Sequence, residues 1–120
     1  MKIHESGEDY LETILMLQRQ KGMVRSVDLA RYMGFSKPSI SHAVKVLQEG
    51  GFLIKDEDGY LHLTDIGKEV AKKIYEKHQF FTNGLIELGV DPAIAEADAY
   101  KIEHVISEES YTKLKEAKRR

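Results

Sequence analysis

The sequence predicts a mostly α-helical protein, in which an N-terminal winged helix-turn-helix with a small β-hairpin wing is followed by an α-helical dimerisation domain. Three observations predict this fold class. Two short stretches with helical apolar spacing are separated by a turn that contains Gly34, which is typical of a helix-turn-helix. Two short apolar runs joined through Asp58-Gly59 then predict a hairpin. Beyond Thr64 the apolar residues again recur at helical spacing.

The first helix is expected to follow Ser6, which suits an N-cap because acidic residues occupy the next turn. It should extend to about Arg19. The apolar positions on one face of this helix are Tyr10, Leu11, Ile14, Leu15 and Leu17.

The two helices of the helix-turn-helix have clear start and stop signals. Gly34 should end the first of them, and Ser36 followed by Pro38 should begin the second, which ends at Gly50-Gly51. The apolar residues expected to pack are Val27, Leu29, Ala30 and Met33 in the first helix and Ile40, Val44 and Leu47 in the second. The hairpin strands are expected within 52–55 and 60–63, with a two-residue turn at Asp58-Gly59.

The charge distribution favours DNA as the partner of this region, although the whole chain has a net charge of −2. Between residues 21 and 45 there are five basic residues against one acidic residue, Asp28. In a winged helix-turn-helix the second helix enters the major groove and the wing touches the flanking backbone. The candidate DNA-binding residues are Arg25, Lys37, Ser39, Ser41, His42 and Lys45. The alternative is a solvated face of an ordinary small helical domain.

The remaining chain is predicted to form helices that need a partner surface. A long helix should open at Thr64-Asp65 and end at Gly89, and another should restart at Asp91-Pro92. A last, basic helix should follow the Ser107–Ser110 cap. We expect domains at residues 1–63 and 64–120, and a homodimer, because so few residues bury little surface alone. The apolar faces comprise Val70, Ile74, His78, Phe81, Leu85 and Leu88, then Ile94, Ala97, Ile102 and Ile106.

Composition excludes several classes of protein. The 120 residues are 42% hydrophobic and 32% charged, and no apolar run is long enough to cross a bilayer. The N-terminus lacks the layout of a secretory signal, so we expect a cytoplasmic protein with no membrane association. Because there is no cysteine, any metal must be held by oxygen and nitrogen ligands.

Several polar residues occupy faces that otherwise point inward. They are carboxylates and imidazoles, which are ligand types for Mn(II), Fe(II) or Zn(II). Each has an ordinary explanation too: first-turn acids complement a helix dipole, and a core histidine is often simply hydrogen-bonded. The candidates are Asp9, Glu12, His78, Glu103 and His104.

The chain resembles the diphtheria toxin repressor and manganese transport regulator family of metal-activated transcriptional repressors. The resemblance rests on "EDYLETILML", "SVDLARYMGFSKPSISHAVKVLQEGGFL", "LTDIGKEVAKKIYEKHQ" and "EADAYKIEHVIS", in this order. It implies a DNA-binding winged helix, a helical dimerisation domain, and a metal between them that acts as corepressor. By position, the resemblance places the manganese-type ligands at Asp9, Glu12, His78, Glu103 and His104.

Two positions bear on which metal is bound. Iron-type members have methionine where this chain has Asp9, and the hard carboxylate favours Mn(II), with Fe(II) or another divalent metal as the alternative. Tyr100 stands where manganese-type members have glutamate, and a phenol is a poor ligand at neutral pH. Glu96, one turn earlier on the same face, is the candidate substitute ligand. The sequence given ends at Arg120, so we expect no C-terminal barrel domain of the iron type.

The sequence therefore predicts a metal-dependent repressor that binds operator DNA and controls metal homeostasis. One alternative is a metal-independent winged-helix regulator that responds to an organic ligand. Another is a metal hydrolase with Glu103 as base, but the chain has no nucleophile motif and no helical HExxH. We therefore expect a protein that is not an enzyme and has no small-molecule substrate.

Overall fold

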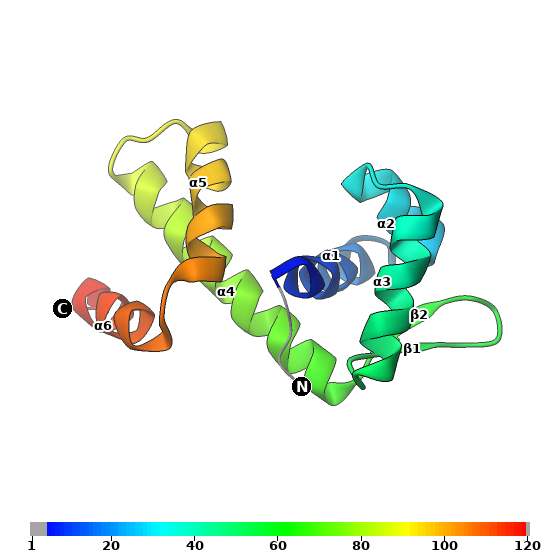
Figure 1. Ribbon diagram of the computed structural model, residues 1–120. Coiled ribbons are helices and arrows are strands. Elements are labelled where there is room, and N and C mark those ends of the chain that lie inside the picture. Colours follow the sequence, from blue (N-terminus) through cyan, green and yellow to red (C-terminus); the bar gives the residue numbers. More distant parts are fainter. Residues whose placement is uncertain (1–4, 120) are drawn as a thin grey trace. The chain divides into compact units, whose positions relative to one another are not determined.

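The computed structural model describes residues 5–119, and its contacts divide into two compact units, one up to Lys73 and one from Ile74 onward. Figure 1 shows the order of the elements along the chain. The predicted fold class is confirmed: a winged helix-turn-helix is followed by further helices, and a single two-stranded antiparallel sheet occurs among the described residues.

The first unit begins with helices α1 (Glu5–Lys21), α2 (Ser26–Met33) and α3 (Lys37–Glu49). Helix α1 starts at Glu5, so the expectation of a helix start after Ser6 is wrong, and the Ser6 side chain lies outside the described residues. Leu11 and Ile14 of α1 are fully buried together with Leu29 of α2 and Ile40 of α3. This contact among three helices is the centre of the core.

The turn between α2 and α3 has the geometry that the sequence predicts. Gly34 adopts a left-handed conformation with φ of 70°, and its N–H donates to the carbonyl of Ala30. Ser36 is the N-cap of α3 and accepts a hydrogen bond from the backbone N–H of Ser39. Val27 differs from the prediction: it is 41% exposed, because it lies beside the buried face of the short helix α2.

The wing consists of β1 (Leu53–Lys55) and β2 (Leu61–Leu63), which pair with Leu53 opposite Leu63. The predicted two-residue turn is wrong. Asp56 and Tyr60 are joined by a backbone hydrogen bond of 2.9 Å, which leaves a three-residue loop. A two-residue Asp-Gly turn needs positive φ at both residues, whereas here only Gly59, with φ of 86°, adopts it.

Hydrogen bonds and close packing anchor the wing to neighbouring segments of the first unit. The N–H of Leu61 donates to the carbonyl of Val24, and the side-chain amide of Gln18 donates to the carbonyl of Leu61. Helix α4 (Asp65–Glu87) begins directly after the wing, with Thr64 capping the N–H of Gly67. Gly67 lies so close to Phe52 that a Cβ atom there would overlap the Phe52 carbonyl oxygen. The wing is therefore held by α1 and the segment before α2 on one strand, and by the start of α4 next to the other strand.

The second unit contains the rest of α4, then α5 (Pro92–Val105) and α6 (Glu108–Arg119). Asp91 caps α5 and Ser107 caps α6, as predicted. The ring of Tyr111 in α6 packs against Phe80 and Phe81 of α4, with centroids 5.6 and 6.0 Å away. This aromatic contact joins the first and last helices of the unit.

Three residues on the predicted apolar faces of the second unit, Leu88, Ile94 and Ala97, are exposed in this single chain, and the buried residues of α5 are Ala95, Ala99 and Glu103 instead. Leu88 is 82% exposed and Ile94 is 56% exposed, although both lie on the predicted apolar faces. Periodicity identifies a helix face but does not tell which part of it a short unit can cover.

No helix of the described residues has the length and apolar content needed to cross a bilayer.

Candidate functional site: a DNA-binding face and a histidine–carboxylate cluster

Helix α3 presents a polar face opposite its buried one. Ile40, Val44 and Leu47 point into the core, which leaves the other side of the helix in solvent. The predicted DNA-binding residues on this side are all exposed: Lys37, Ser39, Ser41, His42 and Lys45. Hydroxyl, imidazole and ammonium groups in this arrangement can reach phosphate oxygens and base edges.

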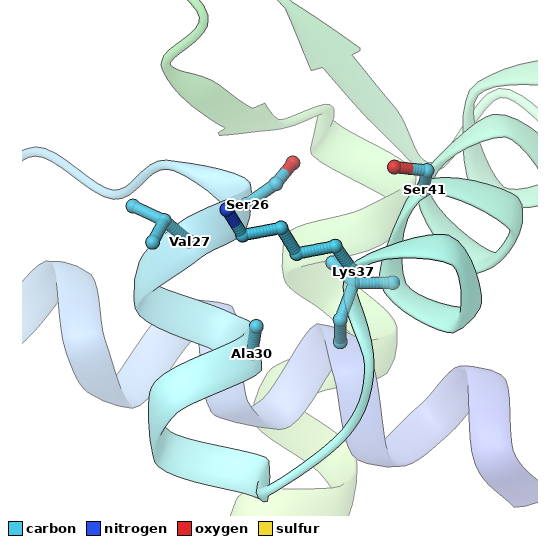
Figure 2. A pocket seen from close by; sticks show the side chains of 6 residues that line it. Ser26, Val27, Ala30, Lys37 and Ser41 are labelled. Carbon is cyan, nitrogen blue, oxygen red and sulfur yellow. The ribbon is translucent and has the colours of Figure 1, made fainter.

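A cavity of about 240 Å³ lies between α2 and α3. Figure 2 shows the side chain of Lys37 extending from the start of α3 toward α2. Ser26, the first residue of α2, also lines the cavity. Its position there could not be predicted, because nothing in the local sequence pattern shows that it faces α3. Both polar and apolar residues line the cavity: Ser26, Val27, Ala30, Lys37, Ile40 and Ser41.

Arg25, the remaining predicted DNA-binding residue, lies where α2 begins. Its guanidinium group is 4.3 Å from the centroid of the Tyr60 ring in the wing. The Asp28 carboxylate accepts from the backbone N–H of Arg25 and pairs with the ammonium group of Lys21 at 2.7 Å. The hydrogen bond from Lys21 is the main cause, followed by that from Arg25, of the lowered pKa of Asp28.

In the second unit the structure brings His78 and Glu103 together from α4 and α5. The Nδ1 atom of His78 is 2.8 Å from Oε2 of Glu103. The Nε2 atom of His104 is 3.4 Å from the other carboxylate oxygen, Oε1. Three of the five predicted metal ligands therefore form one cluster within this unit.

The environment of Glu103 suits a cation. Its side chain is fully buried, and its Oε1 atom has no hydrogen-bond partner among the described residues. Buried carboxylates nearly always pair with hydrogen-bond donors, positive charges or metal ions, since an isolated buried charge is unfavourable. This carboxylate lies between two imidazoles, and one of its oxygens has no hydrogen-bond partner among the described residues. Such a group fits the donor set of a divalent transition metal.

The ring of Tyr100 lies beside one member of this donor set, His104. Its ring packs edge-on against the His104 ring, with centroids 5.2 Å apart, and it is 42% exposed. Glu96 lies one turn earlier in α5 and is exposed. The contact with Tyr100 restricts the orientation of the His104 ring.

The other two predicted ligands belong to the first unit. Asp9 and Glu12 are three residues apart in α1, so they lie on neighbouring positions of one helix face. Glu12 is 7% exposed. The pKa of Tyr10 is raised by burial, and the neighbouring charge of Asp9 adds to the effect.

A winged helix-turn-helix, followed by a helical unit that carries a histidine–carboxylate cluster, defines the class of winged-helix transcriptional regulators with a candidate metal site. Residues 2–64 match the iron dependent repressor, N-terminal DNA binding domain, and residues 64–118 match the iron dependent repressor, metal binding and dimerisation domain. The chain therefore belongs to the iron-dependent repressor family. This is a family of transcriptional regulators and not of enzymes.

Individual relatives agree with this assignment. The transcriptional regulator MntR of Escherichia coli O6:H1 is 38% identical over 103 residues, which cover 86% of this chain and 66% of that protein. The HTH-type transcriptional regulator MntR of Bacillus subtilis (strain 168) is 32% identical over 109 residues, with 91% and 77% covered.

Solved structures of similar fold include a transcriptional repressor and a transcriptional regulator. A manganese-dependent transcriptional repressor in complex with manganese has a TM-score of 0.79 and 28% identity, and the match covers 89% of this chain and 50% of that one. The metal-dependent transcriptional regulator MtsR has a TM-score of 0.85 and 27% identity, with 92% and 52% covered. The chain thus spans less than two thirds of the E. coli relative and about half of these solved chains.

Proposed function

We propose that this chain is a transcriptional repressor whose binding to operator DNA requires a divalent metal. The observation that carries the proposal is the buried Glu103 carboxylate. His78 is at hydrogen-bond distance from one of its oxygens, and His104 lies near the other, which has no hydrogen-bond partner among the described residues. A regulator that holds such a group can sense a cation through it. The resemblance to metal-activated repressors and the names of the relatives support the same function.

Five side chains are proposed to hold the metal: His78, Glu103 and His104 from the second unit, and Asp9 and Glu12 from α1. When bound, the cation supplies positive charge and coordination bonds that favour the conformation in which all five side chains are close together. The carboxylates, once neutralised, also repel the phosphate backbone less.

Mn(II) is the metal we propose first. Asp9 is a hard oxygen ligand, and the donor set contains no sulfur, which suits Mn(II) among the first-row metals. Fe(II) or another divalent transition metal remains the second choice. Several relatives are named as manganese regulators or manganese-dependent repressors, which supports this order.

The DNA-binding surface is proposed to be the exposed side of α3 together with Arg25. Helix α3 would lie in the major groove, and Arg25 and the wing would contact the flanking backbone. A homodimer presents two such helices to two half-sites of an operator, and exposed Leu88 and Ile94 are available to pack against a second copy. We place this protein in the cytoplasm, with the DNA on which it acts.

The test is a DNA-binding titration in which only the metal changes. The duplex is obtained by selecting from randomised DNA with Mn(II) present, because the operator is not known beforehand. Its affinity is then measured with chelator, Mn(II), Fe(II) and Zn(II) in turn. We expect tight binding with Mn(II) and weak binding with chelator, whereas equal affinity in excess chelator would overturn the proposal. The organic-ligand alternative gains no support from the relatives.

A further inference from the structure

The wing is tied to the start of α2 through two residues that face each other, Arg25 and Tyr60. They form an isolated antiparallel bridge next to β2, where the N–H of Leu61 donates to the carbonyl of Val24 at 2.7 Å. A two-stranded hairpin with three-residue strands is marginal alone. The extended segment before α2 therefore serves as a short third strand for the wing.

The backbone of Arg25 is fully engaged. Its N–H donates to Asp28 Oδ2 at 2.8 Å, and its carbonyl accepts from the N–H groups of Asp28 and Leu29. Only its side chain is left to move. The guanidinium group lies over the Tyr60 ring at 4.3 Å from the centroid, within the range of a cation–π contact.

Tyr60 offers a fixed surface for this contact. Its N–H donates to Asp56 Oδ1 and its carbonyl accepts from the N–H of Asp56, both at 2.9 Å. Asp56 is itself held by the His62 ring, whose Nε2 is 2.8 Å from the other carboxylate oxygen. These bonds fix the backbone of Tyr60 and therefore the point from which its ring extends to Arg25.

The positive charge of Arg25 stays available to a ligand. Asp28, the acid nearest in sequence, is already paired with Lys21 at 2.7 Å. In the part of the chain that the structure describes, no carboxylate forms an ion pair with the Arg25 guanidinium, and the residue is exposed. A stack on an aromatic ring orients the cation without neutralising it.

From this geometry we infer that Tyr60 is a positioning residue for DNA binding, which holds the Arg25 guanidinium ready for a backbone phosphate beside the start of α2. The inference rests on the proposed function. The first helix of a helix-turn-helix crosses the DNA backbone, and the positive end of its dipole attracts phosphate at the same place. The ring removes the need to immobilise a long, flexible side chain when DNA binds.

The experiment is a double-mutant cycle with the duplex selected above as probe and Mn(II) present, and the salt dependence of its affinity reports on phosphate contacts. Arg25→Ala should reduce the slope of log K against log salt concentration by about one. Tyr60→Leu, which keeps an apolar side chain but removes the ring, should weaken binding roughly threefold to tenfold. In the Arg25→Ala background, Tyr60→Leu should cause no further loss. Tyr60→Phe, which keeps the ring, should bind like the wild type.

A second measurement reports on the contact without DNA. In the free protein, the ring current of Tyr60 should shift the NMR signals of the Arg25 side-chain protons, and Tyr60→Leu should abolish that shift while Tyr60→Phe retains it. If the wild type binds the duplex and Tyr60→Leu binds equally well, or if the two losses simply add, the positioning role is overturned. If the wild type itself does not bind the duplex, the proposed function fails and the inference fails with it.

Discussion

The Nδ1 atom of His78 lies 2.8 Å from Oε2 of Glu103, although the two residues are 25 positions apart and come from different helices. The opposite oxygen of the same carboxylate is 3.4 Å from the His104 ring and has no hydrogen bond among the described residues. One carboxylate oxygen of Glu103 thus has a hydrogen-bond partner in the protein, and the other, although buried, has none among the described residues. This asymmetry separates a candidate metal ligand from an ordinary buried ion pair.

Substitution of the histidines should separate a ligand from a core residue. His78→Ala and His104→Ala should each weaken Mn(II) binding by at least about tenfold, because even outer-shell partners of a metal contribute that much. Calorimetry measures the affinity, and circular dichroism checks that the fold persists. His62→Ala is the control, since His62 pairs with Asp56 in the wing. A variant that unfolds while its folded fraction still responds to metal would show a core histidine instead.

Tyr100 should limit the metal site. Tyr100→Glu is expected to tighten Mn(II) binding or to raise the number of ions per subunit, because a carboxylate is a better ligand than a phenol for a hard cation. Tyr100→Phe, which keeps the ring that packs against His104, should change neither quantity. Glu96→Ala should weaken binding if Glu96 is the substitute ligand. Native mass spectrometry counts the ions, and unchanged values for both Tyr100→Glu and Glu96→Ala would contradict this account.

Lys45 should contact a phosphate. Lys45→Ala should weaken DNA binding and lower the salt slope by about one, as expected for one lost phosphate contact. Lys72→Ala is the matched control, because Lys72 is also exposed but lies in α4. Fluorescence anisotropy at several salt concentrations gives both slopes. Equal slopes for Lys45→Ala and the wild type would remove Lys45 from the interface.

Two glycines of α4 should respond in opposite ways to alanine. Gly67→Ala would force a Cβ atom into the Phe52 carbonyl, so it should destabilise the protein by about 1–3 kcal/mol. At Gly84 a Cβ atom meets nothing within 4 Å, so Gly84→Ala should stabilise by about 0.5–1 kcal/mol. Urea denaturation measures both changes. A neutral effect of Gly67→Ala would refute the close contact between α4 and the wing.

The Asp28 carboxylate should make stability depend on pH. Its pKa is lowered in the folded state, first by the hydrogen bond from Lys21 and then by that from the Arg25 N–H. The ionised group therefore stabilises the fold fully above its unfolded pKa of about 4, and this contribution is lost as the pH falls through the lowered folded pKa. Asp28→Asn should cost about 0.5–1 kcal/mol at neutral pH, with the gap closing in acid. A gap that is independent of pH would argue against this ion pair.

Local signals in the sequence were sufficient for most of the helices and their ends, with the start of α1 as an exception. Gly34, Ser36 and Asp91 act on the backbone within a few residues, so their roles could be predicted without tertiary structure. The conformation of the wing loop could not be predicted from such local signals. Its geometry depends on Asp56, whose side chain accepts from the N–H groups of Asp58 and Tyr60, and this bond favours a three-residue loop over the expected turn.

The sequence predicted which types of residue form the candidate site, but not which of their side chains are in contact. The residue types of His78, Glu103 and His104 suggest metal binding, but only the packing of α5 on α4 determines that Glu103 meets His78. The contact between Arg25 and Tyr60 joins residues 35 positions apart (60 − 25), and no periodicity predicts it. Contacts of this kind depend on how the wing is anchored.

The central claim, that metal and DNA bind in a coupled way, is tested most directly by measuring the coupling from both sides. The affinity of the selected duplex is determined with saturating Mn(II) and with chelator, and the Mn(II) affinity is determined with and without the duplex. Linkage requires Mn(II) and DNA to raise each other's affinity by the same factor, and we expect a factor of about 5–150. The Glu103→Gln variant should lose most of this factor. A wild-type factor of one would contradict the account.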